Sequence, residues 1–248
     1  MGEKYLNLSG YRFVALTDAP LWRERIHDAA RRAGLRGTVL LAEEGINAFV
    51  AGPADAARAW LQWLRDSDPR FASFEAKESW SDDLPFRRLR VKVKREIIRM
   101  SQPQVRPEAG RAPAVDAITL ARWLDAGRDD AGRALVLLDT RNAFELEHGA
   151  FDGALDWRLA KFSDFPAALA ERKGELHGRT VVTYCTGGIR CEKAALALRD
   201  AGVADVWQLD GGILRYLETV PGARHWHGRC FVFDARASLD AQLAPVIE

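Results

Sequence analysis

The sequence of 248 residues predicts two domains that both combine helices with strands, and three observations lead to that prediction. Over residues 1–100, strand-like and helix-like segments follow one another in the order β-α-β-β-α-β, which is the order of the ferredoxin-like split βαβ unit. Residues 101–115 contain three prolines and little apolar content, which is typical of a linker. After it, continuous apolar strands alternate with helices, which indicates an α/β domain with a parallel sheet.

The elements of the first domain follow from their hydrophobic pattern. Two segments have apolar residues at helical spacing after a proline and predict helices, at 20–34 and 53–66, the first with Thr17 or Asp18 near its cap. Four β-rich segments predict strands, of which the second and third form a hairpin around EEG: 11–16, 37–42, 46–52 and 71–77.

A basic segment follows these elements, from residue 87 to residue 99. Its cations alternate with Leu89, Val91 and Val93, so a strand would place four of them on one face. Such a face is either a solvated edge strand protected from aggregation by its charge, or a surface that follows phosphates. The candidate RNA-binding residues are Arg87, Arg88, Arg90, Lys92 and Lys94.

Composition excludes several classes of protein. The formal net charge is only +1, so attraction to nucleic acid would have to come from a local patch. The chain has no apolar run of membrane-spanning length and no secretory signal layout at its start. Three cysteines argue against a disulfide scaffold. We therefore expect a cytoplasmic protein with reduced thiols and no membrane partner.

The second half repeats the alternation of apolar strands and helices. Between its first strand and the next helix, residues 140–155 read as a long loop. Strands are expected at 134–139, 179–185 and 203–212, and helices at 118–126, 164–172, 192–201 and 213–219.

The segment YCTGGIRCEKAA, residues 184–195, carries the clearest chemistry. Cys185 falls at the carboxyl end of an apolar strand, just before a helix, where open α/β sheets place their ligand sites. Glycines let the backbone aim successive N–H groups inward, and an arginine adds a full positive charge, so a thiol here would ionise readily. We predict Cys185 to be the nucleophile and the following residues to stabilise its anion: Thr186, Gly187, Gly188, Ile189 and Arg190.

Spacing limits the alternatives for this loop. A tyrosine-phosphatase cradle needs five residues between cysteine and arginine, and Arg190 comes one position too early, so the loop suits a single sulfur atom. Cys191 lies six positions after Cys185, too far for CxxC redox or zinc spacing. It is either a resolving thiol or a small residue filling the first helical turn.

Other chemistry-bearing residues stand apart from this loop. His225, His227 and Cys230 offer soft metal ligands but no carboxylate, so we assign no metal. Trp157 and Trp207 are candidates either for stacking a base or for core packing.

Three motifs carry a resemblance. The stretch DTRNAFELEHGAFDGA, the loop opened by Cys185, and VWQLDGGI resemble a rhodanese domain. With LLAEEGIN and CFVFDAR, the chain is more narrowly similar to the rhodanese-like tRNA uridine hydroxylases, the YceA-like or TrhO group.

The resemblance implies a function and a domain layout. It implies a ferredoxin-like (acylphosphatase-like) domain at 1–100, a linker at 101–116, a rhodanese domain at 117–220 and a C-terminal extension at 221–248. It implies that Cys185 carries a persulfide, that Asp139 and Arg141 brace the fold beside it, and that the LLAEEGIN turn faces the Cys185 loop or the RNA.

The activity implied is conversion of the wobble uridine of tRNA to 5-hydroxyuridine, with molecular oxygen as co-substrate. No other cofactor is identifiable from the sequence. The partner expected is the anticodon arm of tRNA, and not DNA. Two alternatives stay open, a thiosulfate or persulfide sulfurtransferase and a non-catalytic RNA-binding scaffold.

Overall fold

The computed structural model of the protein describes residues 4–246, and the chain divides into two compact units, one ending at Ile98 and the other beginning at Arg99. Each unit has a five-stranded sheet of its own. Among the described residues, no helix is long and apolar enough to cross a membrane.

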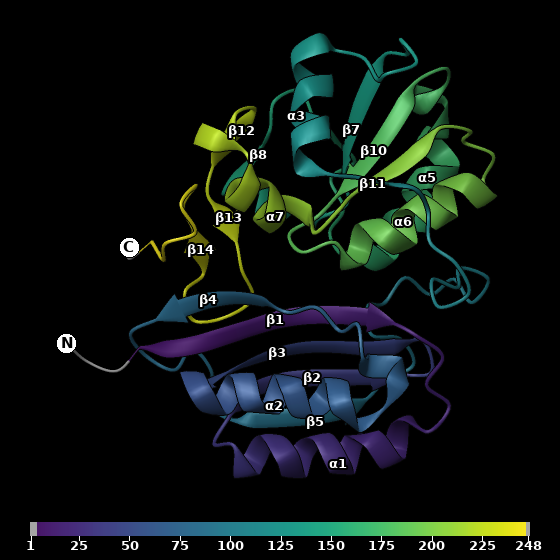
Figure 1. Ribbon diagram of the computed structural model, residues 1–248. Helices are drawn as coiled ribbons and strands as arrows, with labels where there is room; N and C mark the ends of the chain where they lie inside the picture. The colour runs from purple at the N-terminus through teal and green to yellow at the C-terminus, as the bar shows by residue number, and fades with distance from the viewer. Residues whose placement is uncertain (1–3, 247–248) are drawn as a thin grey trace. The chain divides into compact units, whose positions relative to one another are not determined.

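The first unit is a sheet covered on one face by two helices (Figure 1). Strands lie in the order β4-β1-β3-β2-β5, with antiparallel neighbours except for the parallel pair β2 and β5. This confirms the ferredoxin-like order and adds β5 at an edge. The elements are β1 (Tyr5–Phe13), α1 (Ala19–Arg32), β2 (Arg36–Ala42), β3 (Gly45–Pro53), α2 (Ala54–Ser67), a 3₁₀ turn (Pro69–Phe71), β4 (Lys77–Ser81) and β5 (Leu89–Val93).

Alternation along β1 places Leu6 and Leu8 in the core between sheet and helices, where both are almost fully buried. The core extends to α1 through Trp22, whose ring meets Phe71 edge to face at a centroid distance of 4.8 Å. Burial of these large apolar side chains holds the layers together.

Two predicted strands of this unit are displaced. The strand expected at 11–16 lies at Tyr5–Phe13, because Leu6 and Leu8 supply the alternation that buries one face. The strand expected at 71–77 begins only at Lys77, since Phe71 and Phe74 fill the core from a turn. Asp18 does stand at the N-cap of α1, but its carboxylate accepts hydrogen bonds from Trp22 and Arg70 rather than capping the helix.

The second unit is a parallel sheet with helices on both faces, which confirms the predicted α/β class (Figure 1). The strand order is β6-β11-β10-β7-β9, and α5 packs with α6 while α3 packs with α7. Its elements are β6 (Ala114–Val115), α3 (Ala117–Ala126), β7 (Leu135–Asp139), α4 (Ala143–Leu146), β8 (Gly149–Phe151), β9 (Leu155–Asp156), α5 (Phe165–Arg172), β10 (Thr180–Tyr184), α6 (Ile189–Asp200), β11 (Val206–Leu209) and α7 (Gly212–Thr219).

Three features of this unit lie outside the predicted pattern. Residues 114 and 115, expected in the linker, form β6 at the edge of the sheet. The expected long loop at 140–155 contains α4, β8 and β9. Beyond α7, β12 (Trp226–Gly228) pairs with β8, and β13 (Cys230–Phe231) forms a hairpin with β14 (Ser238–Leu239).

Candidate active site

Cys185 lies between the end of β10 and the start of α6, at the carboxyl edge of the parallel sheet. The residue is fully buried, as is Tyr184 before it. The loop turns at Gly188, which has φ of +107° and stands at the N-cap of α6, and its backbone N–H points at Cys185 Sγ at 3.2 Å. Gly187 has an ordinary φ and open space where a Cβ would lie, so only Gly188 needs glycine for its conformation.

The carbonyls of the loop are bound from outside it. Ile213 N donates to Cys185 O at 2.9 Å and Leu214 N donates to Thr186 O at 3.1 Å, both from the first turn of α7. A Cβ on Gly212 would lie 2.4 Å from Cys185 O, so glycine is required for α7 to approach this closely. With the carbonyls held away, the loop presents N–H groups to the sulfur, as an anion site requires.

The two thiols of the loop have opposite tendencies to ionise. Burial by itself would raise the pKa of Cys185, but a hydrogen bond from Cys191, the charge of Arg190 and the backbone N–H groups of both residues outweigh it and lower the pKa to about 5. Burial and the neighbouring Cys185 raise the pKa of Cys191 well above its usual value. At neutral pH the site therefore holds one thiolate and one thiol.

Cys191 has a single proton to donate. Its Sγ lies 2.9 Å from Gly188 O, so the proton can serve either that carbonyl or Cys185. Cys191 therefore lies where its thiol can donate to the backbone or to Cys185, and both expectations for it, a second thiol or a small residue in the first helical turn, stay open.

Arg190 is held by a carboxylate that the sequence reasoning missed. Its guanidinium grips Glu145 of α4 through two hydrogen bonds of 2.5 and 2.7 Å, and both side chains are buried. Burial opposes the charge on Arg190, yet Glu145 outweighs it and raises the arginine's pKa. Glu145 also accepts a hydrogen bond from the Thr186 hydroxyl at 3.3 Å and from Asn142 N at 3.0 Å. The sequence signal for Glu145 is its position three residues after Asn142, a spacing that is typical of the start of a helix.

Asp139 and Arg141 form a buried ion pair at the end of β7, with Arg141 Nη2 2.6 Å from Asp139 Oδ2. Arg141 also donates to Gly149 O at 2.8 Å, and its guanidinium lies 5.8 Å from the centre of the Tyr184 ring. Between them, Thr140 donates from both its N–H and its hydroxyl to Tyr184 O, at 3.0 and 2.8 Å. These contacts fix the end of β10 immediately before Cys185.

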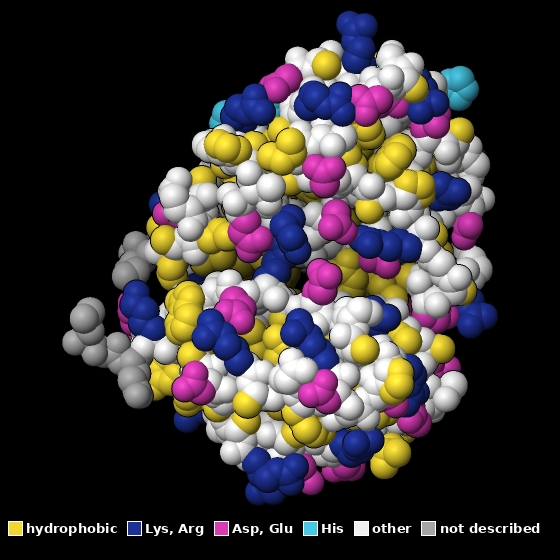
Figure 2. Space-filling view, in the orientation of Figure 1, with side chains coloured by type: hydrophobic (Ala, Val, Ile, Leu, Met, Phe, Trp, Pro, Cys, Tyr) yellow, Lys and Arg dark blue, Asp and Glu magenta, His cyan; other side chains and the backbone are white. Residues whose placement is uncertain are grey.

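The basic segment is the edge strand of the first unit. Val91 is buried toward the helices, whereas Arg90 and Lys92 are exposed on the opposite side, in register with Thr38 and Leu40. The remaining three candidates, Arg87, Arg88 and Lys94, flank the strand and are also exposed. On the face drawn in Figure 2, basic and acidic side chains are interspersed, in keeping with the small net charge.

The histidines and tryptophans that the sequence offered as candidates contact other residues of the second unit. His225 contacts Asp125 at 2.8 Å and His227 contacts Asp152, and within residues 4–246 no three metal-ligating side chains gather. Trp157, almost fully buried, packs on Phe165, whereas Trp207 is partly buried and packs edge to face on Trp123.

The LLAEEGIN turn has a structural task within the first unit. Glu44 Oε1 accepts a hydrogen bond from Ile97 N at 2.7 Å, and Asn47 Nδ2 donates to Ile97 O at 3.4 Å. The two side chains thus hold the segment after β5 against the β2–β3 hairpin.

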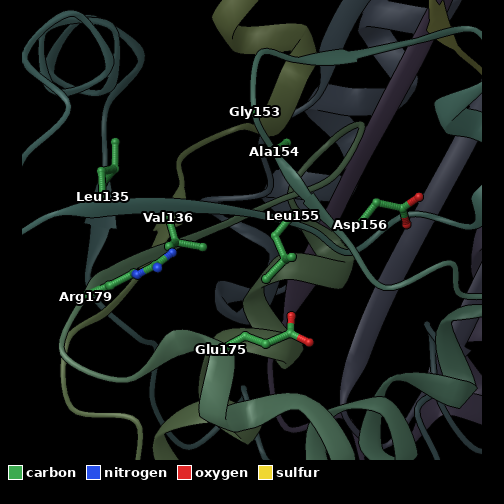
Figure 3. A pocket seen from close by; sticks show the side chains of 8 residues that line it. All are labelled: Leu135, Val136, Gly153, Ala154, Leu155, Asp156, Glu175 and Arg179. Atoms are coloured by element: carbon green, nitrogen blue, oxygen red, sulfur yellow. The ribbon is translucent and has the colours of Figure 1, made fainter.

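A separate hollow of about 450 Å³ lies away from the thiol loop (Figure 3). Its walls come from the first residues of β7, the turn into β9, and Glu175 with Arg179 before β10. No cysteine lines it, and the start of β7 is at the opposite end of the strand from Asp139. The hollow therefore contains none of the site residues predicted from the sequence.

The two folds and the thiol loop define a chain in which an acylphosphatase-like domain precedes a rhodanese-like domain. Family comparison agrees, since residues 5–97 match the UPF0176 acylphosphatase like domain and residues 120–219 match the Rhodanese-like domain. Among solved structures, the rhodanese-like domain of an Anabaena protein aligns with a TM-score of 0.37 and 24% identity, over 47% of this chain and 80% of that one.

Full-length relatives give the family. A tRNA uridine(34) hydroxylase of Variovorax paradoxus is 56% identical, over 98% of this chain and 91% of the relative. One of Bordetella pertussis is 58% identical over 97% and 98%, and one of Burkholderia pseudomallei 55% over 98% and 82%. The chain belongs to the tRNA uridine(34) hydroxylase family.

Proposed function

We propose that this protein hydroxylates the wobble uridine of tRNA to 5-hydroxyuridine in the cytoplasm, with Cys185 as the catalytic nucleophile and molecular oxygen as co-substrate. The observation that carries the proposal is the Cys185 loop, whose thiol has a pKa lowered to about 5 in a chain more than half identical to tRNA uridine(34) hydroxylases.

The chemistry follows from that thiolate. Addition of Cys185 Sγ to C6 of uracil would form a carbon–sulfur bond, break the C5–C6 double bond and make C5 electron-rich. Two-electron oxidation of C5 with molecular oxygen as the oxidant, followed by loss of the C5 proton and of the thiolate from C6, would restore the double bond. The loop N–H groups stabilise the sulfur before attack and after release, and Cys191 supplies one further hydrogen bond.

Binding of the anticodon arm is supported by the exposed cations of β5. Arg90 and Lys92 share one face of an edge strand, and Arg88 and Lys94 continue it on either side. Phosphate contacts of this kind supply affinity that is independent of sequence and falls with salt.

The test uses tRNA from cells that lack the protein. Wild type should produce 5-hydroxyuridine, measured by nucleoside mass spectrometry, and Cys185→Ser should produce none. Neutralising Arg88, Arg90 and Lys92 with glutamine should lower tRNA affinity and flatten its salt dependence. The matched control removes three exposed arginines elsewhere, Arg32, Arg128 and Arg199. Full product formation by Cys185→Ser would disprove the assignment.

Sulfur transfer is the second candidate, favoured by the tightness of the loop, which encloses one sulfur atom. Wild type turning over thiosulfate and cyanide while leaving tRNA unmodified would support it in place of the first. Under this alternative, neutralising the β5 cations should leave turnover unchanged.

A further inference from the structure

Three phenylalanines form an aromatic cluster beside the thiol loop: Phe144, Phe231 and Phe233. Phe231 lies between the others, with ring centroids 5.1 Å from each, and the rings meet at 86–88°. Phe144 and Phe233 are 6.3 Å apart. The cluster is an edge-to-face arrangement, so each ring keeps a π-face of its own.

Two of these rings are unusually exposed. Phe144 exposes 41% of its surface and Phe233 54%, whereas most large apolar side chains of the described chain are buried. An exposed contiguous aromatic group usually marks a binding site. Packing inside the protein therefore accounts for Phe231 better than for its two neighbours.

The cluster lies beside the thiol loop through one contact and one chain neighbour. The guanidinium of Arg190 lies 5.7 Å from the centre of the Phe233 ring, and Arg190 is the last residue of the loop that begins with Cys185. Phe144 directly precedes Glu145, the carboxylate that grips Arg190 and Thr186. The nucleotide next to a base that reacts at Cys185 could therefore reach the Phe233 ring, which lies beside Arg190.

Two of the three rings come from outside the rhodanese-like domain. That domain match ends at residue 219, whereas Phe231 and Phe233 lie on and after β13 in the C-terminal extension. The general thiol chemistry of the loop is complete without them, so the extension adds a feature that serves the substrate.

We propose that Phe144 and Phe233 form a stacking platform for an unpaired RNA base that flanks the reacting uridine. The inference rests on the proposed function and specifies how its substrate is held. Enzymes that act on a base take it out of the stack, and RNA-binding surfaces receive unstacked bases on aromatic rings. Separate ring faces set at right angles suit flat bases better than they suit the continuous apolar surface of a protein partner.

A thermodynamic cycle tests the platform in the intact protein. The ligands are an anticodon stem–loop RNA with uridine at position 34 and two copies of it, with an abasic site at position 33 or 35. The proteins are wild type, Phe144→Leu/Phe233→Leu, and Phe233→Trp, which keeps a stacking ring. Ile118→Ala is the matched control, because Ile118 is 51% exposed on α3 and lies outside the cluster.

If the platform stacks a base, the double leucine variant should bind the intact RNA about tenfold more weakly than wild type does. On the abasic RNA that lacks the stacked base, the variant and wild type should have equal affinity. Phe233→Trp and Ile118→Ala should bind like wild type. Equal losses on all three RNAs, no loss at all, or a change in self-association instead of RNA binding would overturn the inference.

The two proposals fail differently. If wild type makes no 5-hydroxyuridine, the proposed function is refuted. If wild type makes the normal product but the leucine substitutions weaken binding equally on intact and abasic RNA, only the platform is refuted. The rate of Cys185 alkylation at pH 7 serves as the folding check, and it should be the same in every variant. A variant that loses it is replaced by its single-leucine counterparts in the same cycle.

Discussion

Cys185 and Cys191 share a buried site in which one sulfur carries a negative charge and the other a proton. The division arises from position, since Cys185 receives the N–H of Gly188 while Cys191 lies against the carbonyl of the same residue. Glu145 affects the thiolate indirectly, because its hydrogen bonds hold the Arg190 guanidinium beside the loop. The negative charge of Glu145 also partly neutralises the positive charge of Arg190. A positioning residue of this kind tunes a thiolate without touching it.

The pH dependence of Cys185 reactivity follows from its lowered pKa. Because the thiolate exists above the pKa and is lost as the pH falls through it, alkylation by iodoacetamide should be half-maximal near pH 5 and flat from about pH 6.5 to 8. Cys191→Ala removes a hydrogen bond to the thiolate and should move the midpoint upward, whereas Cys191→Ser keeps a donor and should move it less. Peptide mass spectrometry identifies the alkylated residue.

A midpoint near pH 8 to 9 in wild type would contradict the assigned thiolate. A Cys191→Ala midpoint equal to that of wild type would show that Cys191 only fills space.

At the scale of elements, the site depends on the approach of α7 to the Cys185 loop. Gly212 has φ of +64° and its Cα faces the carbonyls of Cys185 and Thr186, so this position is constrained both by conformation and by contact. The DGG turn before α7 is therefore part of the site, although it contains no reactive group.

Gly212→Ala should destabilise the protein and abolish the fast alkylation of Cys185, because a Cβ would lie 2.4 Å from the carbonyl oxygen of Cys185. The matched control is Gly222→Ala, at φ of +68° with no neighbour within 4 Å of its Cβ. It carries the same backbone strain, on the order of 1 kcal/mol, without the contact. Urea unfolding and alkylation rates compare the two. Equal effects would show that strain alone matters.

The sequence predicted the elements that a local hydrophobic pattern determines. It did not predict those that depend on contacts between residues far apart in the chain. Helix α2 and the β2–β3 hairpin appear where the pattern places them, since alternation and helical spacing report burial directly. The apolar residues Phe71 and Phe74 predict a strand, because nothing in the local pattern shows that a turn brings them to the core.

The same limit applied to the site. Cys185, two glycines and Arg190 are contiguous in sequence, so their conjunction could be read. Glu145 lies 45 positions from Arg190, and nothing local shows that the two meet. Phe233 is also more than 40 positions from Arg190, and of the two tryptophans predicted as candidates for stacking a base, Trp157 is buried and Trp207 is partly buried.

On the scale of the whole molecule, the chemical and the basic features belong to different units. Cys185 and the groups that lower its pKa lie after residue 99, whereas the cations of β5 lie before Ile98. The near-neutral net charge of +1 thus conceals a basic strand, which belongs to the unit that does not carry the thiol.

A fragment spanning residues 99–248 should fold alone, since it has its own sheet and hydrophobic core. Its Cys185 should show the alkylation profile of the full chain, with a midpoint near pH 5, because every group that lowers the pKa is retained. Without β5, its affinity for tRNA should fall and depend less on salt. Circular dichroism, alkylation and RNA binding measure the three properties. A fragment that binds tRNA like the full chain would remove β5 from the interface.

Phe231 and Phe233 come later in the chain than every group that lowers the pKa of Cys185, so the proposed base platform and the reactive thiol are encoded separately. The residues that prepare the thiolate end with α7 at Thr219, and the extension that carries these rings comes afterwards. Substitutions at Phe233 would alter what lies against Arg190 without removing any group that lowers the pKa of Cys185. A change in which base is held beside the thiol could thus be sought at Phe233 alone, without rebuilding the reactive centre.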